Sequence, residues 1–179
     1  LIVATEDGTV VCYDIENKNE LWKVSSEGRI LYPLIGNKNM VFTLTRANGE
    51  LIAYSIKDGS KKWSVKLADI QKTDIDPVYY NGKIVLTKQT AGKSVVLIVD
   101  SQKGNLESKI EVDEMISSPY IFDNRIYFGG SSGKIYCYSL EKGKNLWVYK
   151  PVKKGLTFVV ADTDGVYGIL KKTMVKVVK

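Results

Sequence analysis

The side chains that carry most enzyme chemistry are few in this sequence, and they are poorly grouped. Histidine is absent from all 179 residues, which excludes the common Ser-His-Asp and Cys-His catalytic arrangements. The same absence removes the usual ligand sets for zinc and iron. The two cysteines, Cys12 and Cys137, lie 125 positions apart and do not form a disulfide framework.

Carboxylates are the remaining candidates for acid–base chemistry or metal binding. The segment DTDG at 162–165 resembles the start of a calcium loop, but apolar residues follow where further ligands would be needed. Asp and Gly there are typical of a hairpin turn. Asp74, Asp76, Asp113 and Glu114 fall in connections between strands, where a catalytic carboxylate pair is not favoured. We therefore expect no catalytic residue, no cofactor and no metal site.

The net charge of +6 is carried by scattered lysines. Lys and Arg total 26, and only Arg29, Arg46 and Arg125 are arginines, whereas nucleic-acid recognition relies on arginine for bidentate base contacts. The lysines lie mostly in turns, as in EKGKN and KDGSKK, where they keep a surface solvated and protect strand edges. We expect no nucleic-acid partner, although a lysine-rich face that binds phosphate is an open alternative. No apolar run approaches the roughly 20 residues of a membrane helix, so membrane insertion is not expected.

A repeat of about 42 residues organises the chain. Tyrosine or valine recurs in register, and nine residues after each copy comes tryptophan or, once, serine. The intervals between these last positions are 41, 45 and 39 residues, and they include every tryptophan of the chain. The aligned positions are Tyr13, Tyr54, Val99 and Tyr138, followed by Trp22, Trp63, Ser108 and Trp147. A period of this length is typical of the four-stranded blade of a β-propeller.

The pattern within each repeat predicts four antiparallel strands, A to D. Segments such as KIYCYSL are rich in β-branched and aromatic residues and are separated by Gly-, Asn- and Asp-containing turns. No convincing amphipathic helix interrupts them. We expect an all-β, single-domain propeller over 1–179, incomplete, with about four to five blades. Its units are 1–24 (partial), 25–67, 68–113, 114–150 and 151–179 (partial).

The chain starts in a B strand and ends in a C strand, so the first unit lacks strand A and the last lacks strand D. We expect that residues preceding Leu1 have been lost from a longer propeller or from a short five-bladed one. Open blade edges present unpaired backbone groups, which invite association with another chain.

The repeats resemble the pyrroloquinoline-quinone (PQQ)-like β-propeller family. Its pattern is a small residue, an Asp, a turn with Gly and a Trp at relative positions 1, 3, 7 and 11, a tryptophan-docking motif. The matching residues are the small residues Cys12, Ala53 and Cys137, the turn glycines Gly59, Gly104 and Gly143, and the tryptophans Trp22, Trp63 and Trp147. The resemblance implies that each Trp docks against a neighbouring blade and that the small residue leaves room for it. Ile98 and Ser108 depart from the pattern, so the third unit should have a different inter-blade contact. WD40 repeats fit less well, because their Gly-His and Trp-Asp pairs are absent.

The resemblance also bears on function. The quinone dehydrogenases of the family use calcium, a catalytic Asp and a vicinal Cys-Cys pair on eight blades, and this chain has no adjacent cysteines. The non-enzymatic branch includes a periplasmic lipoprotein of the outer-membrane barrel-assembly machinery. We therefore expect a non-catalytic scaffold for protein–protein binding that is periplasmic, cell-surface or secreted. The alternative is a fragment of a PQQ- or calcium-dependent oxidoreductase whose active-site residues lie outside this chain.

A protein partner is expected on one face of the propeller. Strands alternate in direction, so D–A and B–C connections share a face, and A–B and C–D turns share the other. The longer D–A connections, near 68–76 and 111–117, are acidic with apolar tips, and function concentrates on long loops held by a rigid scaffold. The candidate partner-binding residues are Asp74, Asp76, Asp113, Glu114 and Met115. The alternative is that these are ordinary solvated loops.

Overall fold

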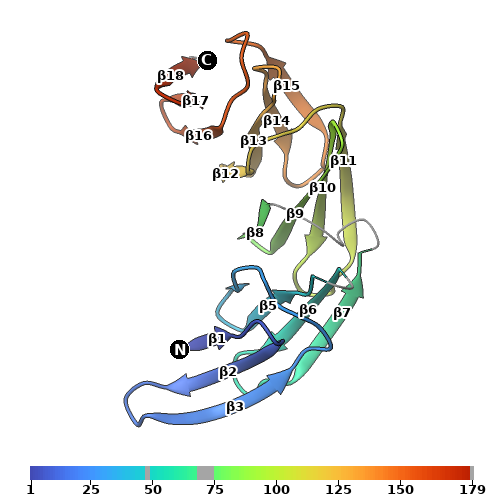
Figure 1. The fold of residues 1–179 in the computed structure, drawn as a ribbon, viewed down its shortest axis with the longest axis vertical. Helices are drawn as coiled ribbons and strands as arrows, with labels where there is room; N and C mark the ends of the chain where they lie inside the picture. The colour runs from blue at the N-terminus through green and yellow to red at the C-terminus, as the bar shows by residue number, and fades with distance from the viewer. Residues whose placement is uncertain (47–48, 68–74, 178–179) are drawn as a thin grey trace. The chain divides into compact units, whose positions relative to one another are not determined.

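The structure is a computed structural model that describes residues 1–46, 49–67 and 75–177. Strands, turns and bends account for all regular structure in these residues (Figure 1). None of the described residues forms a helix, so they contain no helical segment that could cross a membrane.

Eighteen strands in the described residues form five separate antiparallel sheets (Figure 1). The first sheet is β1 (Ile2–Ala4), β2 (Thr9–Asp14) and β3 (Asn19–Ser25). The second is β4 (Ile35–Gly36), β5 (Met40–Leu44), β6 (Glu50–Ser55) and β7 (Lys61–Lys66). The third is β8 (Ile75–Tyr80), β9 (Lys83–Thr90), β10 (Lys93–Asp100) and β11 (Leu106–Val112). The fourth is β12 (Tyr120–Phe122), β13 (Arg125–Gly129), β14 (Ile135–Ser139) and β15 (Asn145–Tyr149), and the fifth is β16 (Phe158–Asp162), β17 (Gly165–Leu170) and β18 (Thr173–Val177).

In every sheet the strands pair in chain order, which confirms the predicted all-β fold of up-and-down blades. The middle sheets have the four strands A to D, and the first and last sheets have three described strands each. Short turns make this order possible. At the A–B turn of the fourth sheet both central residues, Asp123 and Asn124, have positive φ, of 48° and 54°. That geometry matches the twist of the flanking strands, as in a type I′ turn.

Burial follows strand position. Strands β5 and β6 are buried along their whole length, because they occupy the middle of their sheet and both faces are covered. The outer strand β7 instead alternates between exposed and half-buried residues, and β15 is mostly exposed. In the three four-stranded sheets the B and C strands are therefore the more buried strands, and the D strands are the more exposed.

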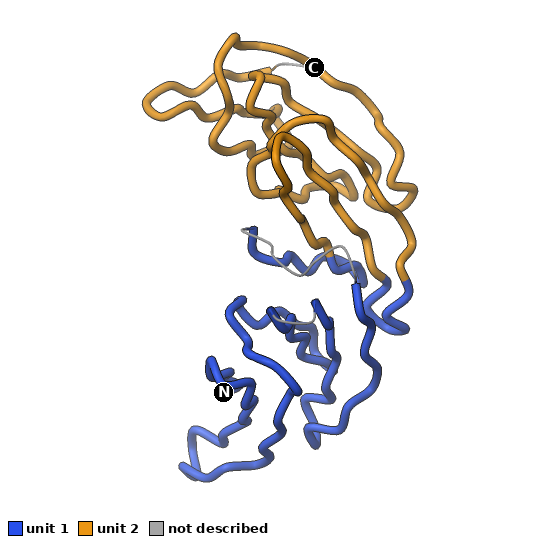
Figure 2. The backbone as a smooth tube through the Cα atoms, turned by 45° about the vertical axis from the view of Figure 1, so that its right-hand side comes forward, with its two compact units in different colours: residues 1–84, 100–105 blue, residues 85–99, 106–179 orange. Residues whose placement is uncertain are grey.

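The chain divides into two compact units (Figure 2). The first comprises Leu1–Ile84 with Asp100–Asn105, and the second comprises Val85–Val99 with Leu106–Lys179. Each has a hydrophobic cluster of its own. In the first unit the buried cluster is Val10, Cys12, Trp22, Ile30, Val41, Ile52 and Tyr54. In the second it is Tyr127, Ile135, Cys137, Leu156, Val159, Ala161 and Val166.

Candidate functional site

The repeated tryptophans lie directly opposite the small residues of the preceding strand. Cys12 pairs with Trp22, Ala53 with Trp63, and Cys137 with Trp147. The register shifts immediately after each of these pairs, as it does at a β-bulge, and it shifts at the same place after Ile98 in the third sheet. A bulge re-aims a side chain. The repeated pattern therefore specifies the direction of the tryptophan ring as well as the space beneath it.

Two of the tryptophans contact the C–D turn of the following sheet. The indole Nε1 of Trp22 donates a hydrogen bond to the Ile56 carbonyl oxygen at 2.8 Å, and that of Trp63 donates to the Ser101 carbonyl oxygen at 3.1 Å. The rings lie over Gly59 and Gly104, where an added Cβ would come within 2.8 Å and 2.6 Å of ring atoms. Both glycines have positive φ, of 70° and 73°, which most other residues avoid. These turns therefore need glycine both for the backbone conformation and for the ring.

In the third unit isoleucine takes the place of the small residue, and serine takes the place of the tryptophan. Ile98 is fully buried and faces Ser108 across the strands, and Ser108 lies against Gly143 of the next turn. The larger side chain on β10 compensates for the smaller one on β11. The third contact is therefore different in kind, with a serine where the other units have an aromatic ring.

Trp147 has different surroundings. Its ring is half-buried beside Tyr127, with ring centroids 6.1 Å apart. It borders a largely apolar hollow of about 550 Å³ in the second unit. Val148, Tyr149 and Val175 line the same hollow.

Neither cysteine offers a reactive surface thiol. Cys12 and Cys137 are both buried, and neither forms a disulfide. Among the residues that the structure describes, no three Asp, Glu, Cys or His side chains gather closely enough to hold a metal ion. The buried thiols occupy equivalent places opposite tryptophans, where they act as small packing side chains.

The predicted partner-binding residues belong to two connections. Asp74 lies outside the described residues, and Asp76 is exposed on β8 in the first unit. Asp113, Glu114 and Met115 form the connection after β11 in the second unit. Sequence alone treated these residues as one class, and the structure gives them different surroundings.

Asp113 and Met115 face solvent. The Asp113 side chain is 89% exposed, and its carboxylate lies 3.1 Å from the Lys93 ammonium, a surface ion pair that contributes little to stability. Met115 is 37% exposed, and its carbonyl oxygen accepts a hydrogen bond from the Ser131 backbone nitrogen at 2.9 Å. The backbone is thus fixed while the methionine side chain stays accessible.

Glu114, between them, points inward. Its side chain is 11% exposed, and its carboxylate accepts hydrogen bonds from the Ser132 backbone nitrogen at 2.6 Å, from the Ser132 and Ser131 hydroxyls and from the Tyr136 hydroxyl. Burial alone raises the pKa of this carboxyl, but the hydrogen bonds outweigh burial and hold the pKa below its usual value. The Glu114 carboxylate therefore ties the connection after β11 to the turn at 131–133 and is not free to meet a partner.

The sequence did not indicate the hydrogen-bond donors to Glu114. Ser131 and Ser132 read only as hairpin-turn residues, and Tyr136 as a strand residue. The alternation of strand direction does place the D–A connection and the B–C turn on one face, and the contact between Glu114 and Ser132 agrees with that geometry.

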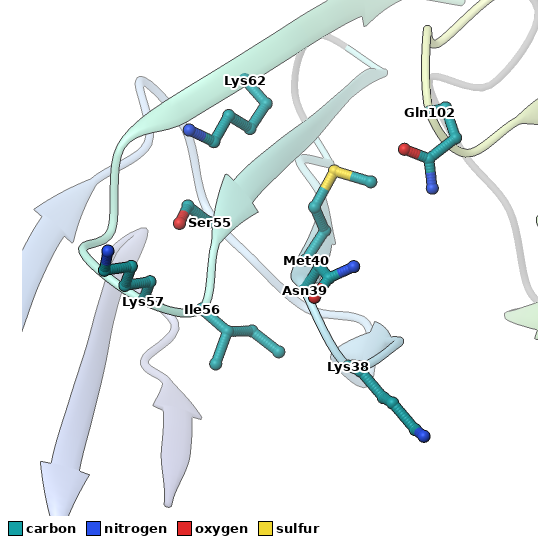
Figure 3. A pocket seen from close by; sticks show the side chains of 8 residues that line it. All are labelled: Lys38, Asn39, Met40, Ser55, Ile56, Lys57, Lys62 and Gln102. Atoms are coloured by element: carbon teal, nitrogen blue, oxygen red, sulfur yellow. The ribbon is translucent and has the colours of Figure 1, made fainter.

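On the A–B and C–D side, the first unit has a polar hollow of about 490 Å³ (Figure 3). The residues that line it come from the turns and strand ends of the second and third sheets. They are Lys38, Asn39, Met40, Ser55, Ile56, Lys57, Lys62 and Gln102. Sequence reasoning placed Lys57 in a tight turn but did not predict that three lysines share one hollow.

Comparison with known proteins places the chain in a family. A family model described as outer membrane protein assembly factor BamB matches residues 1–176. The chain belongs to this family. The PQQ-like repeat resemblance expected from the aligned tryptophans is thereby confirmed.

Solved structures share the fold at low sequence identity. The BamB structure from Moraxella catarrhalis superposes with a TM-score of 0.71 at 19% identity, over 93% of this chain and 51% of that chain. The computationally designed Ika8 protein gives 0.73 at 20%, over 99% and 54%. A quinohemoprotein alcohol dehydrogenase from Comamonas testosteroni gives 0.65 at 13%, over 98% and 37%. This chain spans about half the length of the BamB chain.

One curated protein shows a short match. Lupanine 17-hydroxylase [cytochrome c] from a Pseudomonas species is 49% identical over 39 residues. That segment is 22% of this chain and 6% of the hydroxylase, so it amounts to about one repeat and shows the repeat type.

Proposed function

We propose that this chain is a non-catalytic scaffold that binds another protein outside the cytoplasm. The support for binding is the family, whose model is described as an assembly factor for outer membrane proteins. The same description supports a location at the cell envelope. The buried thiols and the dispersed carboxylates of the described residues support a role without catalysis.

The observation that carries the proposal is the construction of the connection after β11. The Glu114 carboxylate fixes this connection from the inside, and the Ser94 hydroxyl donates to the Glu114 carbonyl oxygen at 2.9 Å. Asp113 and Met115 project from this fixed backbone. A preorganised loop loses little conformational entropy when it binds. An exposed methionine beside a charge suits contact with a protein surface, since methionine adapts its shape to its partner.

Site-specific crosslinking tests this surface. A photoreactive amino acid at position 115 should crosslink to one protein in an extract of the source organism, and mass spectrometry identifies that protein. Asp113→Lys combined with Glu111→Lys should reduce the crosslink several-fold, because both side chains are exposed and reversal repels an attracted partner.

The control places the same photoreactive group at Lys103, on a C–D turn. The proposal is wrong if position 103 captures the same protein as efficiently, or if the charge-reversed variant crosslinks unchanged. Thermal unfolding of each variant should match the parent, because none of these side chains is buried.

A second candidate is a fragment of a PQQ- or calcium-dependent oxidoreductase. The match to one repeat of lupanine 17-hydroxylase and the fold of the quinohemoprotein dehydrogenase favour it. Equilibrium dialysis with PQQ and calcium distinguishes the two proposals. Calcium-dependent retention of PQQ by the chain would favour the oxidoreductase, and equal PQQ concentrations on both sides of the membrane would favour the scaffold.

A further inference from the structure

The polar hollow of the first unit concentrates positive charge. Lys57 and Lys62 are exposed at its edge, and in Figure 3 their amino groups lie on the same side as Ser55. Lys38 contributes a third ammonium group and extends away from the other two (Figure 3). The amides of Asn39 and Gln102 add neutral hydrogen-bond donors, and the buried Met40 with the half-buried Ile56 adds apolar surface.

The repeats show that the fold does not require these lysines. Positions 55, 57 and 62 carry Ser, Lys and Lys, and no other aligned repeat has a lysine at any of the three. The corresponding residues are Asp14, Glu16 and Leu21 in the first repeat, Asp100, Gln102 and Glu107 in the third, and Ser139, Glu141 and Leu146 in the fourth. Summed over these three positions, the second repeat carries a charge of +2, whereas the first, third and fourth repeats carry −2, −2 and −1.

The turn that supplies Lys38 also differs from its counterparts. The A–B connection at 37–39 has three residues, whereas those at 81–82 and 123–124 have two. The Asn37 side chain orders this longer turn by accepting hydrogen bonds from the backbone nitrogens of Asn39 and Met40, at 2.8 Å and 2.9 Å. The extra residue brings Lys38 and Asn39 to the hollow.

One carboxylate lies close by and is already engaged. Asp58 accepts hydrogen bonds from the Ser60 backbone nitrogen and hydroxyl at 3.0 Å and 2.7 Å. These bonds, with another from Ser55 and the charge of Lys62, hold the pKa of the Asp58 carboxyl far below its usual value. Asp58 therefore offsets part of the Lys62 charge. The ammonium of Lys61 is directed elsewhere, 3.9 Å from the Glu50 carboxylate.

From this arrangement we propose that the hollow lined by Lys38, Lys57 and Lys62 is a binding site for a phosphate group. Lysine binds phosphate as a point charge, and a hollow of about 490 Å³ has the size of a small-molecule site. Met40 and Ile56 would contact the apolar part of the molecule that carries the phosphate. The site shares no residue with the proposed partner surface, and the proposal does not depend on that surface.

Titration of the ¹⁵N-labelled chain with inorganic pyrophosphate, at constant ionic strength, tests the site. Saturable shifts are expected in the amide signals of Lys57, Lys62 and Gln102. The variant Lys57→Glu with Lys62→Leu carries the residues that the fourth repeat has at these positions, so it should fold normally. It should bind pyrophosphate on the order of tenfold more weakly or worse, because two charge-assisted contacts are lost.

The matched control is Lys142→Glu with Lys144→Gln, which removes two exposed lysines from the C–D turn of the fourth sheet and lowers the net charge by three, as the test variant does. It should bind like the parent. Equal weakening in both variants would mean that only net charge matters, and it would overturn the proposal, as would shifts that do not saturate or that spread over all the lysine-bearing turns.

A second arm asks what carries the phosphate. Vesicles of phosphatidylcholine with and without phosphatidic acid are floated with the parent chain and with the Lys57→Glu, Lys62→Leu variant. Flotation that needs both phosphatidic acid and the two lysines assigns the site to a lipid headgroup. Pyrophosphate binding without flotation assigns it to a soluble phosphate compound. Absence of binding in both arms overturns the proposal.

Discussion

At the residue scale, the Trp22 and Trp63 rings leave no room for a side chain at the turn glycines that they cover. Gly104→Ala places a Cβ against the Trp63 ring and forces alanine into a left-handed backbone conformation. We expect a loss of about 2–4 kcal/mol in the free energy of unfolding, from backbone strain and the clash together. Urea unfolding monitored by fluorescence measures it.

Gly92→Ala is the matched control. Gly92 also has positive φ, of 77°, but an added Cβ there would meet nothing within 4 Å. Gly92→Ala should lower the free energy of unfolding only by the cost of the backbone strain, about 1–2 kcal/mol. If the two variants unfold at the same urea concentration, ring contact does not contribute at Gly104.

Removal of the ring should have different effects at Trp63 and at Trp147. The Trp63 ring lies tilted against Phe42, with ring centroids 5.7 Å apart, and its indole nitrogen donates a hydrogen bond to the next turn. Trp63→Ala should destabilise by about 3–5 kcal/mol, the usual cost of a large aromatic truncation. Trp147→Ala should cost less, since no described turn glycine covers its ring. Thermal unfolding of both variants ranks them, and a larger loss for Trp147→Ala would contradict the argument.

At the scale of the elements, the connection after β11 depends on an ionised carboxylate. The folded-state pKa of Glu114 lies below the unfolded value of about 4.5. Its stabilising contribution is therefore complete above that value and is lost as the pH falls through the folded pKa. Glu114→Gln should destabilise the chain by about 1–3 kcal/mol at pH 7.

The difference between Glu114→Gln and the parent should shrink as the pH is lowered below about 4.5, and urea unfolding at a series of pH values measures it. Asp113→Asn, one residue earlier and exposed, serves as the comparison and should change stability little at any pH. A Glu114→Gln defect that stays constant from pH 7 to pH 3 would show that packing, not charge, holds the connection.

Adjacent residues in the connection after β11 have different roles. In a strand connection, side chains on neighbouring residues point in different directions, so Glu114 can face the turn at 131–133 while Asp113 and Met115 face solvent. The sequence alone shows that the connection after β11 is acidic. Only the position of the next B–C turn decides which of its carboxylates stays available.

At the scale of the whole molecule, the described part of the chain ends in a three-stranded sheet in which β18 is an edge strand. Edge strands have unpaired backbone groups that can pair with another chain. We expect the 179-residue chain to associate reversibly at micromolar concentration, and sedimentation velocity at several concentrations measures it. Met174→Lys, at an exposed position of β18, should weaken association, since edge lysines oppose strand pairing. Concentration-independent sedimentation of the parent as a monomer would refute this expectation.

The sequence by itself determined the fold class, the strand order and the family. The reason is periodicity: residues such as Trp22 and Trp63 recur at a fixed spacing because each blade solves the same packing problem with its neighbour. Turn residues such as Asn124 report their backbone geometry locally. Signals of this kind need no knowledge of distant contacts.

Only the tertiary structure decided how individual polar side chains are used. The Glu114 carboxylate accepts hydrogen bonds from the turn at 131–133, although the adjacent Asp113 is exposed. Lys57 and Lys62 came to share a hollow with Lys38 because A–B and C–D turns meet on one side of a sheet. In the third unit the large side chain, Ile98, is on strand β10 and the small one, Ser108, is opposite it on β11. The other aligned units have the small residue first and the large one second. Each outcome depends on residues far apart in the chain, and a side chain's burial and partners are set by those contacts rather than by its local sequence.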